Sequence, residues 1–397
     1  MNDTLNATPI NPSPVAISPS ADFRYPHRVA ALRARMAQSA ENNPAVSALV
    51  VTHLENIAYL TGFTGSNALL FLTQSEAVFL TDGRYAIQSA TEVPGFERVI
   101  LPQGTEMAKA AAEQITKRHL PNAGFEAAHL SVKAFDILRA AVDGENGAGK
   151  SVALVPKSGM VEAVRAVKDA DEIARLRAAV ALGDRGFDYL RGLAKPGMTE
   201  KQLAWQLEIF LRESGATRLS FDSIVGSGAN SALIHGRPSN RVIGSSGAAE
   251  FLLLDFGAEL DGYCSDLTRT VVIGGEPTAR HRAVYDSVVR AQAAAIATIR
   301  PGVAGKDVHK AAVESFKRDG MEEHFGHGTG HQLGRIVHDG QAFGVTSEVT
   351  LEENMIVTIE PGLYIEGFGG VRIEDVGRIT ADGVEILTHS PRELLVL

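Results

Sequence analysis

Two aspartates in the second half of the chain have a spacing that could support chemistry. Asp255 ends an apolar run and Asp266 follows a polar turn in the segment FLLLDFGAELDGYCSDLTRTVVI (251–273). A hairpin turn centred on Leu260 and Asp261 would place the two carboxylates directly opposite each other, with Cβ atoms about 4.5–5.5 Å apart. Carboxylates that close repel each other unless a proton or a metal ion lies between them. The alternative for this hairpin alone is that both aspartates lie near a turn and face solvent.

Two glutamates repeat this arrangement in the segment MIVTIEPGLYIEGFGGVRIEDVGRI (355–379). Glu360 and Glu374 are equally far from Gly367 along the chain, so a hairpin centred on that glycine would let them face each other across a ladder. Glu360 also follows the apolar run 356–359, where an unpaired charge is costly to bury. A second carboxylate pair of this kind favours a shared cation site over two unrelated turns.

A glycine-rich segment, HFGHGTGHQLGRIVHD (324–339), supplies imidazoles. It holds four of the chain's 12 histidines, His324, His327, His331 and His338, among four glycines. A single buried histidine is usually a hydrogen-bonded core residue, but this density beside conformationally free backbone favours a functional site.

Together, four carboxylates and imidazole form an oxygen-rich ligand set whose charge balances two divalent cations. Such a set suits Mn²⁺ best, with Co²⁺, Fe²⁺ and Zn²⁺ as alternatives. Two ions of this kind would polarise a scissile carbonyl and convert a bridging water into the nucleophile.

The elements that must carry these residues form two parts. Residues 28–156 alternate strand-like and helix-like segments. The expected strands are 46–51, 68–73, 77–81 and 152–155, the second and third forming a hairpin, and the expected helices are 104–118 and 133–142. A long helix follows, because Asp169 and Glu172 have the spacing of a capping box. We expect an α/β (α+β) chain with a disordered tail (1–27), an amino-terminal domain (28–160) and a second domain (161–397).

The second domain contains an internal repeat. Residues 195–197 (Lys-Pro-Gly) correspond to residues 300–302 (Arg-Pro-Gly), and the helix-end segments 211–215 and 316–320 correspond at the same offset. Each copy predicts a helix, a Pro-Gly turn, a second helix and a glycine stop. A duplicated half-domain with pseudo-twofold symmetry would place a site between its halves, whereas the alternative is chance similarity between two helix pairs.

Composition narrows the functional classes. The 38 Lys and Arg against 47 Asp and Glu argue against a basic face for nucleic acid. The chain lacks an apolar run long enough for a membrane helix and a recognisable signal peptide. The single cysteine, Cys264, permits neither an internal disulfide nor a thiolate cluster, so we expect a cytoplasmic location. The segment GENGAGKS (144–151) matches a P-loop pattern, but a helix precedes it and a strand follows, the reverse of a nucleotide site.

The motifs together resemble the pita-bread metallopeptidases. The resemblance rests on the Asp-x10-Asp spacing and on HGTGHQLGRIVHD (327–339), IEPGLY (359–364) and VRIED (371–375). The stretches NIAYLTGFTGSNALLFLT and AVFLTDGRY, within residues 56–85, resemble Xaa-Pro aminopeptidase and prolidase rather than methionine aminopeptidase. The resemblance covers nearly the whole chain. It implies a creatinase/prolidase-type amino-terminal domain followed by a pita-bread catalytic domain.

Individual metal-binding roles come from the resemblance and not from the spacing. It implies that Asp255 binds one metal ion and that His331 and Glu360 bind the other. Asp266 and Glu374 would bridge the two ions, and Glu360 would also carry the proton of the attacking water. The residue spacing and the resemblance therefore lead to the same five ligands.

The resemblance also assigns residues around the metal ions. His235 matches a histidine on the leaving-group side, and His338 matches one that binds substrate and assists the tetrahedral intermediate. His327, Tyr364 and Arg372 match positions that support the ligands or the substrate.

The implied activity is hydrolysis of the Xaa-Pro bond at the amino terminus of proline-containing peptides by an Xaa-Pro aminopeptidase, with Xaa-Pro dipeptidase (prolidase) as the alternative. A homodimer is implied as well. A creatinase-like hydrolase and a non-catalytic binding module are remote alternatives, because relatives of those kinds lose metal ligands. Asp339 and Arg335 depart from the residues common in the family, as do residues 340–342, near the expected substrate groove.

Overall fold

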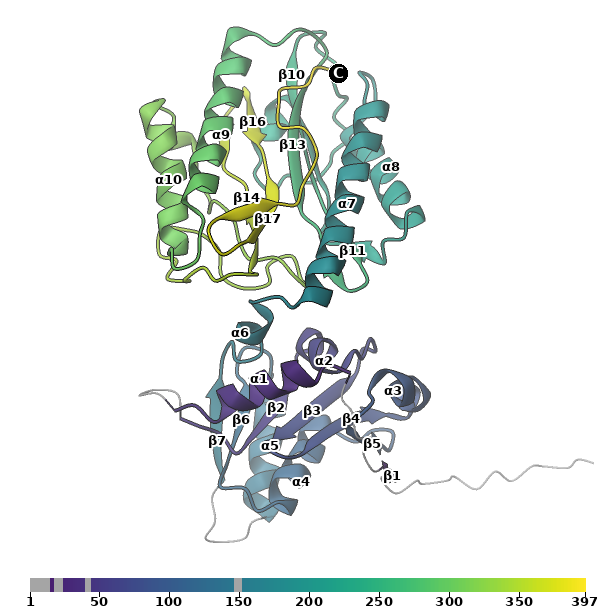
Figure 1. Cartoon of the computed structure of the whole chain (residues 1–397). Coiled ribbons are helices and arrows are strands. Elements are labelled where there is room, and N and C mark those ends of the chain that lie inside the picture. The colour runs from purple at the N-terminus through teal and green to yellow at the C-terminus, as the bar shows by residue number, and fades with distance from the viewer. Residues whose placement is uncertain (1–14, 18–23, 40–43, 146–151) are drawn as a thin grey trace, which may run out of the picture. The chain divides into compact units, whose positions relative to one another are not determined.

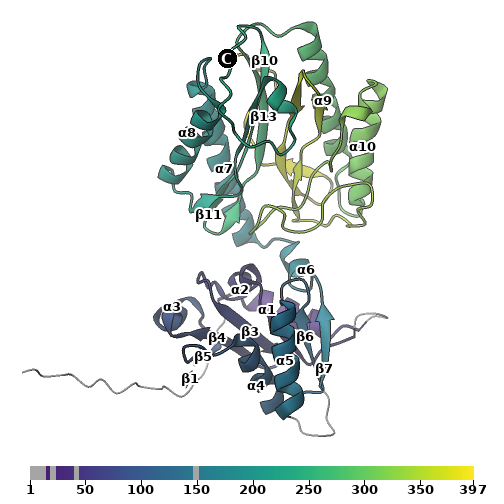
Figure 2. The same cartoon turned by 180° about the vertical axis from the view of Figure 1, so that it is seen from behind.

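The computed structural model describes residues 15–17, 24–39, 44–145 and 152–397. The chain divides into two compact units, Met1–Val164 (unit 1) and Arg165–Leu397 (unit 2). Figures 1 and 2 show the elements of each unit from opposite sides.

In its described part, unit 1 contains a seven-stranded mixed sheet in the order β1-β5-β4-β3-β2-β6-β7. The strands are β1 (Val15–Ile17), β2 (Ala48–Val51), β3 (Ala68–Thr73), β4 (Ala77–Asp82), β5 (Glu97–Leu101), β6 (Asn122–Glu126) and β7 (Ala153–Lys157). The helices are α1 (Pro26–Met36), α2 (Leu54–Thr61), α3 (Ala86–Glu92), α4 (Met107–Lys117), α5 (Val132–Glu145) and, across the boundary with unit 2, α6 (Glu162–Arg165). Alternate residues of the central strands point into two apolar clusters, one on each face.

The predicted strands and helices of unit 1 are confirmed, including the antiparallel β3–β4 hairpin. Strand β6 was missed because its sequence, NAGFE, has little strand character; its parallel neighbours β2 and β7 hold it in the sheet. Most of the predicted tail (1–27) lies outside the described residues. Within it, Val15–Ile17 pair with β5 and Pro26 begins α1, so the prediction of disorder is wrong there. The P-loop-like segment also lies outside the described residues, apart from the end of α5.

Unit 2 places two pairs of helices around small antiparallel sheets (Figures 1 and 2). The helices are α7 (Ala170–Leu193), α8 (Glu200–Glu213), α9 (Ala279–Thr298) and α10 (Gly305–Arg318). The strands are β8 (Arg218–Leu219), β9 (Ile224–Ser227), β10 (Glu250–Phe256), β11 (Ala258–Leu260), β12 (Tyr263–Cys264), β13 (Leu267–Ile273), β14 (Ile356–Ile359), β15 (Gly362–Ile365), β16 (Gly369–Arg372), β17 (Asp375–Ile379) and β18 (Val384–Ile386).

The internal repeat corresponds to the two helix pairs. Gly197 ends the turn between α7 and α8 with φ 96°, and Gly302 ends the turn between α9 and α10 with φ 86°. The residues that precede the second helix of each pair, Thr199 and Ala304, each form a backbone bridge to a later segment of their own half. Apolar residues of α7 and α8 pack on β10 and β13, whereas those of α9 and α10 pack around β14 to β16. The hairpins that carry the predicted carboxylates therefore lie between the two helix pairs.

The predicted capping box at the start of the long helix is confirmed. The Asp169 carboxylate accepts a hydrogen bond from the backbone N–H of Glu172, whose own carboxylate accepts from the backbone N–H of Asp169. These two contacts satisfy donors that would otherwise be unpaired at the helix start. Helix α7 thus begins at Ala170 for a purely local reason.

Candidate metal centre

The first carboxylate pair lies on the β10–β13 hairpin in a different register from the predicted one. Asp255 is paired with Thr268, not with Asp266, so the prediction of directly opposed aspartates is wrong. The turn is centred on Asp261 and Gly262, which have φ values of 50° and 76°. Positive φ at both central positions is typical of a type I′ hairpin turn, for which Asp-Gly is a preferred sequence. The one-residue shift of the turn makes Asp255 and Asp266 diagonal neighbours on the same face.

The second carboxylate pair lies in the predicted register. Ile359 pairs with Asp375 on one side of Glu360 and Glu374, and Gly362 pairs with Arg372 on the other. A hairpin centred on Gly367, whose φ is 73°, is therefore confirmed. Neither glutamate belongs to a strand, because each lies where one short ladder ends and the next begins.

His331 is presented from the glycine-rich segment. Its backbone N–H donates to Thr358 Oγ1 at 3.0 Å, and Gly330 fits against β14 where an added Cβ would lie 2.0 Å from the Thr358 carbonyl oxygen. The ring Nδ1 lies 3.1 Å from the carbonyl oxygen of Gln332, which can only accept. The proton of the neutral ring is thereby assigned to Nδ1, and the lone pair of Nε2 is available to a metal ion.

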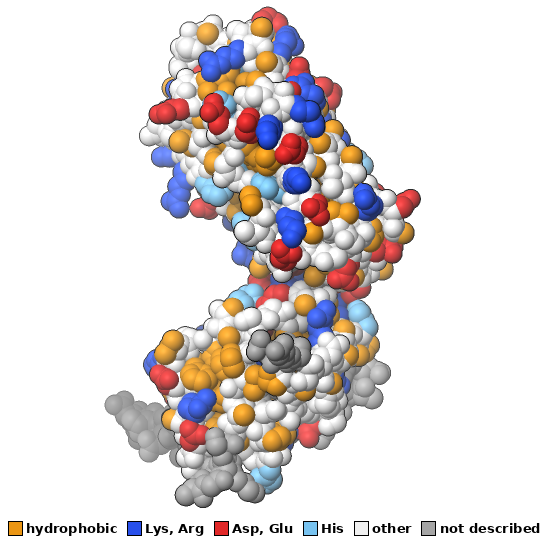
Figure 3. Space-filling model, turned by 90° about the vertical axis from the view of Figure 1, so that its left-hand side faces the viewer, with side chains coloured by type: hydrophobic (Ala, Val, Ile, Leu, Met, Phe, Trp, Pro, Cys, Tyr) orange, Lys and Arg blue, Asp and Glu red, His pale blue; other side chains and the backbone are white. Residues whose placement is uncertain are grey.

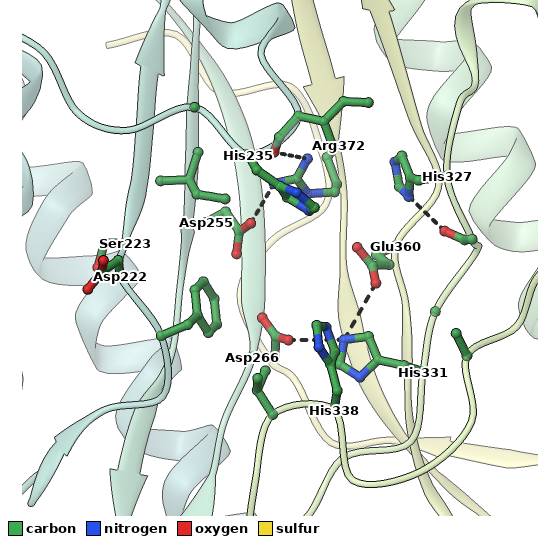
Figure 4. A pocket seen from close by; sticks show the side chains of 18 of the residues that line it. Asp222, Ser223, His235, Asp255, Asp266, His327, His331, His338, Glu360 and Arg372 are labelled. Carbon is green, nitrogen blue, oxygen red and sulfur yellow. Dashed lines mark hydrogen bonds and ion pairs between the residues drawn. The ribbon is translucent and has the colours of Figure 1, made fainter. Parts of the chain in front are cut away.

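Carboxylates from both hairpins surround that nitrogen. Nε2 of His331 lies 3.4 Å from Asp266 Oδ2 and 3.6 Å from Glu360 Oε1. Ligand atoms of Asp266, His331 and Glu374 all lie within 4.8 Å of one another. Figure 4 shows Asp255, Asp266, Glu360 and His331 directed toward a common space. The structure thus brings together all five residues predicted as ligands, from three separate segments between residues 255 and 374.

The electrostatics of these carboxylates favour a bound cation. Burial raises the pKa of Asp266 well above its usual range, and repulsion from Asp255 and Glu360 raises it further. Burial likewise raises the pKa of Glu374, with repulsion from Asp266, Glu360 and Asp255. The pKa of Glu360 is raised by burial too. Divalent cations would replace lost hydration and offset this repulsion, so the donor set fits them.

Two buried oxygens provide a separate test of that fit. Among the described residues, Asp255 Oδ1 and Glu374 Oε1 have no hydrogen-bond partner. Buried carboxylate oxygens are normally paired, because leaving one without a partner costs about 1–3 kcal/mol or more. Both oxygens belong to predicted metal ligands. Their lack of a protein donor is expected if each binds a metal ion.

A hydrogen-bonded network surrounds the ligands and fixes their other oxygens. Arg372 forms a buried ion pair with Asp255 through Oδ2. The Thr268 hydroxyl donates to Glu374 Oε2 at 2.8 Å. Arg372 Nη1 also donates to the Tyr364 hydroxyl at 2.6 Å, and that hydroxyl lies 2.8 Å from His327 Nε2. Asp255 and Glu374 therefore each have one oxygen held by the protein and one oxygen without a hydrogen-bond donor.

The orientation of His327 follows from this network. Its Nδ1 lies 2.7 Å from the carbonyl oxygen of Gly328, so Nδ1 carries the proton and Nε2 accepts from Tyr364. Burial, together with the nearby positive charge of Arg372, lowers the pKa of His327 to about 4. His327 is therefore a neutral support for the ion pair near neutral pH and not a direct ligand.

A cavity of about 710 Å³ opens onto the centre. Its polar wall contains Asp255, Asp266, His331, Glu360, Arg372, His327, His235 and His338. The His338 ring lies perpendicular to that of His331, with centroids 4.4 Å apart, and burial lowers its pKa. His324 does not line the cavity and instead forms an ion pair with its neighbour Glu323.

Some residues of the site had no sequence signal. Phe221 and Ile224 form part of the apolar wall, and Arg237 adds a cation from the loop that also carries His235. Thr268 is recognisable only once the ladder places its hydroxyl against Glu374. Neither residue type nor sequence spacing can identify such residues, because each gains its role from a partner that is distant in the sequence.

The fold and this centre define the class. An α/β unit precedes a pseudo-twofold unit with a carboxylate–histidine centre between its halves, which is the architecture of a pita-bread metallopeptidase. The family model of metallopeptidase family M24 matches residues 174–381, and that of the creatinase/prolidase N-terminal domain matches residues 28–167. The chain belongs to metallopeptidase family M24.

Individual relatives agree with this assignment over most of the chain. The uncharacterized peptidase YqhT of Bacillus subtilis is 38% identical over 89% of this chain and 96% of its own length. A structure of an Xaa-Pro dipeptidase from Bacillus anthracis has a TM-score of 0.86 and 34% identity, covering 94% of this chain and 100% of its own. An X-Pro aminopeptidase from Thermotoga maritima has a TM-score of 0.79 and 32% identity, covering 89% of this chain and 98% of its own.

Helix hydropathy and surface charge can also be described for the residues that the structure covers. None of their helices combines the length and hydropathy that a membrane span requires. Acidic and basic side chains are intermixed on the face shown in Figure 3, which accords with the net charge of −9.

Proposed function

We propose that the chain is an Xaa-Pro aminopeptidase, which releases the residue that precedes proline at the amino terminus of a peptide. The observation that carries this proposal is the set of buried carboxylates and His331 at the wall of an open cavity, with His235 and His338 beside them. Its volume of about 710 Å³ lies within the usual range for ligand pockets and offers room beyond a dipeptide. An Xaa-Pro dipeptidase is the alternative, since solved structures of both kinds are similar to this chain.

The proposed metal ligands are Asp255, Asp266, His331, Glu360 and Glu374, which would hold two divalent ions. When bound, such ions polarise a carbonyl and lower the pKa of water. The oxygen-rich donor set favours Mn²⁺. The resemblance to the family implies that Asp266 and Glu374 would each help to hold both ions, and their ligand atoms lie within 4.8 Å of one another and of His331.

The other residues would handle protons and the substrate. Glu360 lies at the cavity wall beside His331 and would accept a proton from the attacking water. His338, next to His331, would donate a hydrogen bond to the oxygen of the tetrahedral intermediate. His235, on the loop that carries Arg237, would contact the leaving-group side.

We also propose that the protein is a homodimer and lies in the cytoplasm.

A matched pair of substrates tests the activity. Metal-free enzyme should release no alanine from Ala-Pro or from Ala-Pro-Ala, and Mn²⁺ should restore release from both. Release from Ala-Pro alone would make the chain a dipeptidase, and an active EDTA-treated enzyme without re-added metal would overturn the metal-dependent mechanism. Ala-Ala-Ala is the matched peptide control, because its cleavage at an equal rate would overturn the proline specificity. His338→Ala should lower kcat, whereas His324→Ala, outside the cavity, should not.

A further inference from the structure

A second group of metal-ligating side chains lies in unit 1, at one edge of its sheet. Strands β2, β6 and β7 are parallel neighbours, so their carboxyl ends meet at that edge. His53 comes shortly after β2, His129 shortly after β6, and Glu162 follows β7 as the first residue of α6. Ligands of open α/β sheets bind at such carboxyl ends.

The three side chains converge on one carboxylate oxygen. Glu162 Oε1 lies 4.0 Å from His53 Nδ1 and 3.6 Å from His129 Nε2. Their possible ligand atoms all lie within 4.8 Å of one another. Ions such as Zn²⁺ bind nitrogen and oxygen at about 2.0–2.2 Å in a tetrahedron, which places ligand atoms about 3.4 Å apart. The two separations between the carboxylate oxygen and the imidazole nitrogens, 3.6 and 4.0 Å, exceed that spacing by about 0.2 and 0.6 Å.

The two imidazole rings already lie together. Their centroids are 3.7 Å apart and their planes differ by only 5°. The nitrogen lone pairs of two stacked rings lie in parallel planes and do not point to one position. One ring must therefore tilt before both can bind the same ion. The side chain of His129 is 33% exposed and belongs to a turn, so it has the freedom to do this. The stacked pair is thus a preassembled ligand set that needs one side-chain rotation.

The surrounding charge also favours a cation. Glu126 and Glu162 both accept a hydrogen bond from the same atom, Asn56 Nδ2, at 2.6 and 2.7 Å. Burial raises the pKa of Glu126, and repulsion from Glu162 adds to it. The second oxygen of Glu126 accepts from the backbone N–H groups of Thr52 and His53 at 2.6 and 2.7 Å. These hydrogen bonds fix the loop that carries His53. The carboxylates of Glu126 and Glu162 place negative charge next to the two imidazole rings.

We propose that His53, His129 and Glu162 form a binding site for one Zn²⁺ ion, separate from the peptidase centre. Two imidazoles and one carboxylate suit Zn²⁺ and leave the fourth coordination position to water. The ion would join the segments that follow three adjacent strands, and would thereby stabilise the carboxyl edge of the sheet in unit 1.

Zinc stoichiometry in the full chain tests this site. Because the proposed peptidase centre would also bind Zn²⁺, the comparison is made in a His331→Ala background, and zinc is counted per chain by atomic absorption after equilibrium dialysis. His129→Ala and Glu162→Gln are the site variants. His119→Ala is the matched control, because this exposed histidine of unit 1 lies outside the group. The control should retain one more Zn²⁺ per chain than either site variant.

Equal zinc content in the control and in both site variants would overturn the proposal. A thermal melt gives a second readout that does not rely on stoichiometry. Zn²⁺ should raise the Tm of the control and not that of Glu162→Gln, which keeps the side-chain volume of the wild type. An equal rise in Tm in both proteins would also refute the site. Neither result depends on whether the chain cleaves Xaa-Pro bonds.

Discussion

Asp339 offers a prediction whose magnitude follows from its contacts. Its buried carboxylate forms an ion pair with Arg165 through Oδ1, and Oδ2 lies 3.8 Å from Lys168 Nζ. Oδ2 also accepts from the backbone N–H of Arg335 at 3.1 Å. All three charged side chains are buried, with 0% of Arg165 and Lys168 and 2% of Asp339 exposed. The Asp339 carboxylate therefore compensates the buried charge of Arg165 beside the segment that carries His338. Together with Glu172 it also favours the charged form of Lys168, whose pKa burial lowers.

Asp339→Asn keeps the shape and removes the charge. Breaking a buried pair by removing one partner costs about 3–5 kcal/mol, because the remaining charge is left uncompensated. Asp339→Glu keeps the charge but adds a methylene group to a side chain that packs tightly against Gly334. The contact is so close that a Cβ added to Gly334 would lie 1.8 Å from Asp339 Oδ2. Overpacking of this kind costs about 1–3 kcal/mol. The asparagine variant should therefore be the less stable of the two.

Urea denaturation of metal-free protein, followed by far-ultraviolet circular dichroism, measures both costs. Asp382→Asn is the control, because Asp382 lies in an exposed turn and its replacement should change stability by less than about 0.5 kcal/mol. A loss below about 1 kcal/mol in Asp339→Asn would refute the role of the charge. A larger loss in Asp339→Glu than in Asp339→Asn would show that packing, not charge compensation, dominates at this site.

Three further predictions concern the network around the ligands. Thr268→Val should weaken Mn²⁺ binding by about 10–100-fold, because it removes the donor to Glu374 Oε2; unchanged affinity in a Mn²⁺ titration would exclude this support. Tyr364→Phe should lower the free energy of unfolding by about 1–3 kcal/mol, because its hydroxyl joins His327 to Arg372; an unchanged urea midpoint would contradict that reasoning. In the folded protein, burial lowers the pKa of His327 to about 4. In the unfolded chain, the same histidine becomes protonated below about pH 6.5. The wild type should therefore lose stability as the pH falls from about 6.5 to about 4, and His327→Gln should lose less; equal pH slopes would disprove it.

The sequence predicted local features well where neighbouring residues determine them. The capping box at Asp169 and Glu172 involves residues three apart, and its two hydrogen bonds form within one helical turn. The hairpin around Gly367 was likewise predicted in the correct register, because the glycine required by the turn lies midway between two apolar runs. In both cases the conformation is decided by interactions within a few residues.

The hairpin of residues 251–273 shows the limit of that reasoning. Its two acidic residues suggested a symmetric pairing, but the backbone preference of Asp261-Gly262 for positive φ sets the turn one residue later. The backbone preference of the two turn residues, and not the positions of the aspartates, sets the register of the hairpin. A shift of the turn by one residue changes every cross-strand pair in the ladder. The Asp-Gly pair that sets the turn is therefore a local signal present in the sequence.

The sequence by itself thus determined which residue types are present, where the long helix α7 begins and where one of the two hairpins turns. The tertiary structure decided which of these residues meet. Arg372 reaches Asp255, Thr268 reaches Glu374 and Arg165 reaches Asp339 across more than 100 residues of chain. Such contacts exist only because the apolar faces of two helix pairs pack on the strands between them. Burial within that packing also creates the pKa shifts, because it removes water from side chains whose types alone carry no such information.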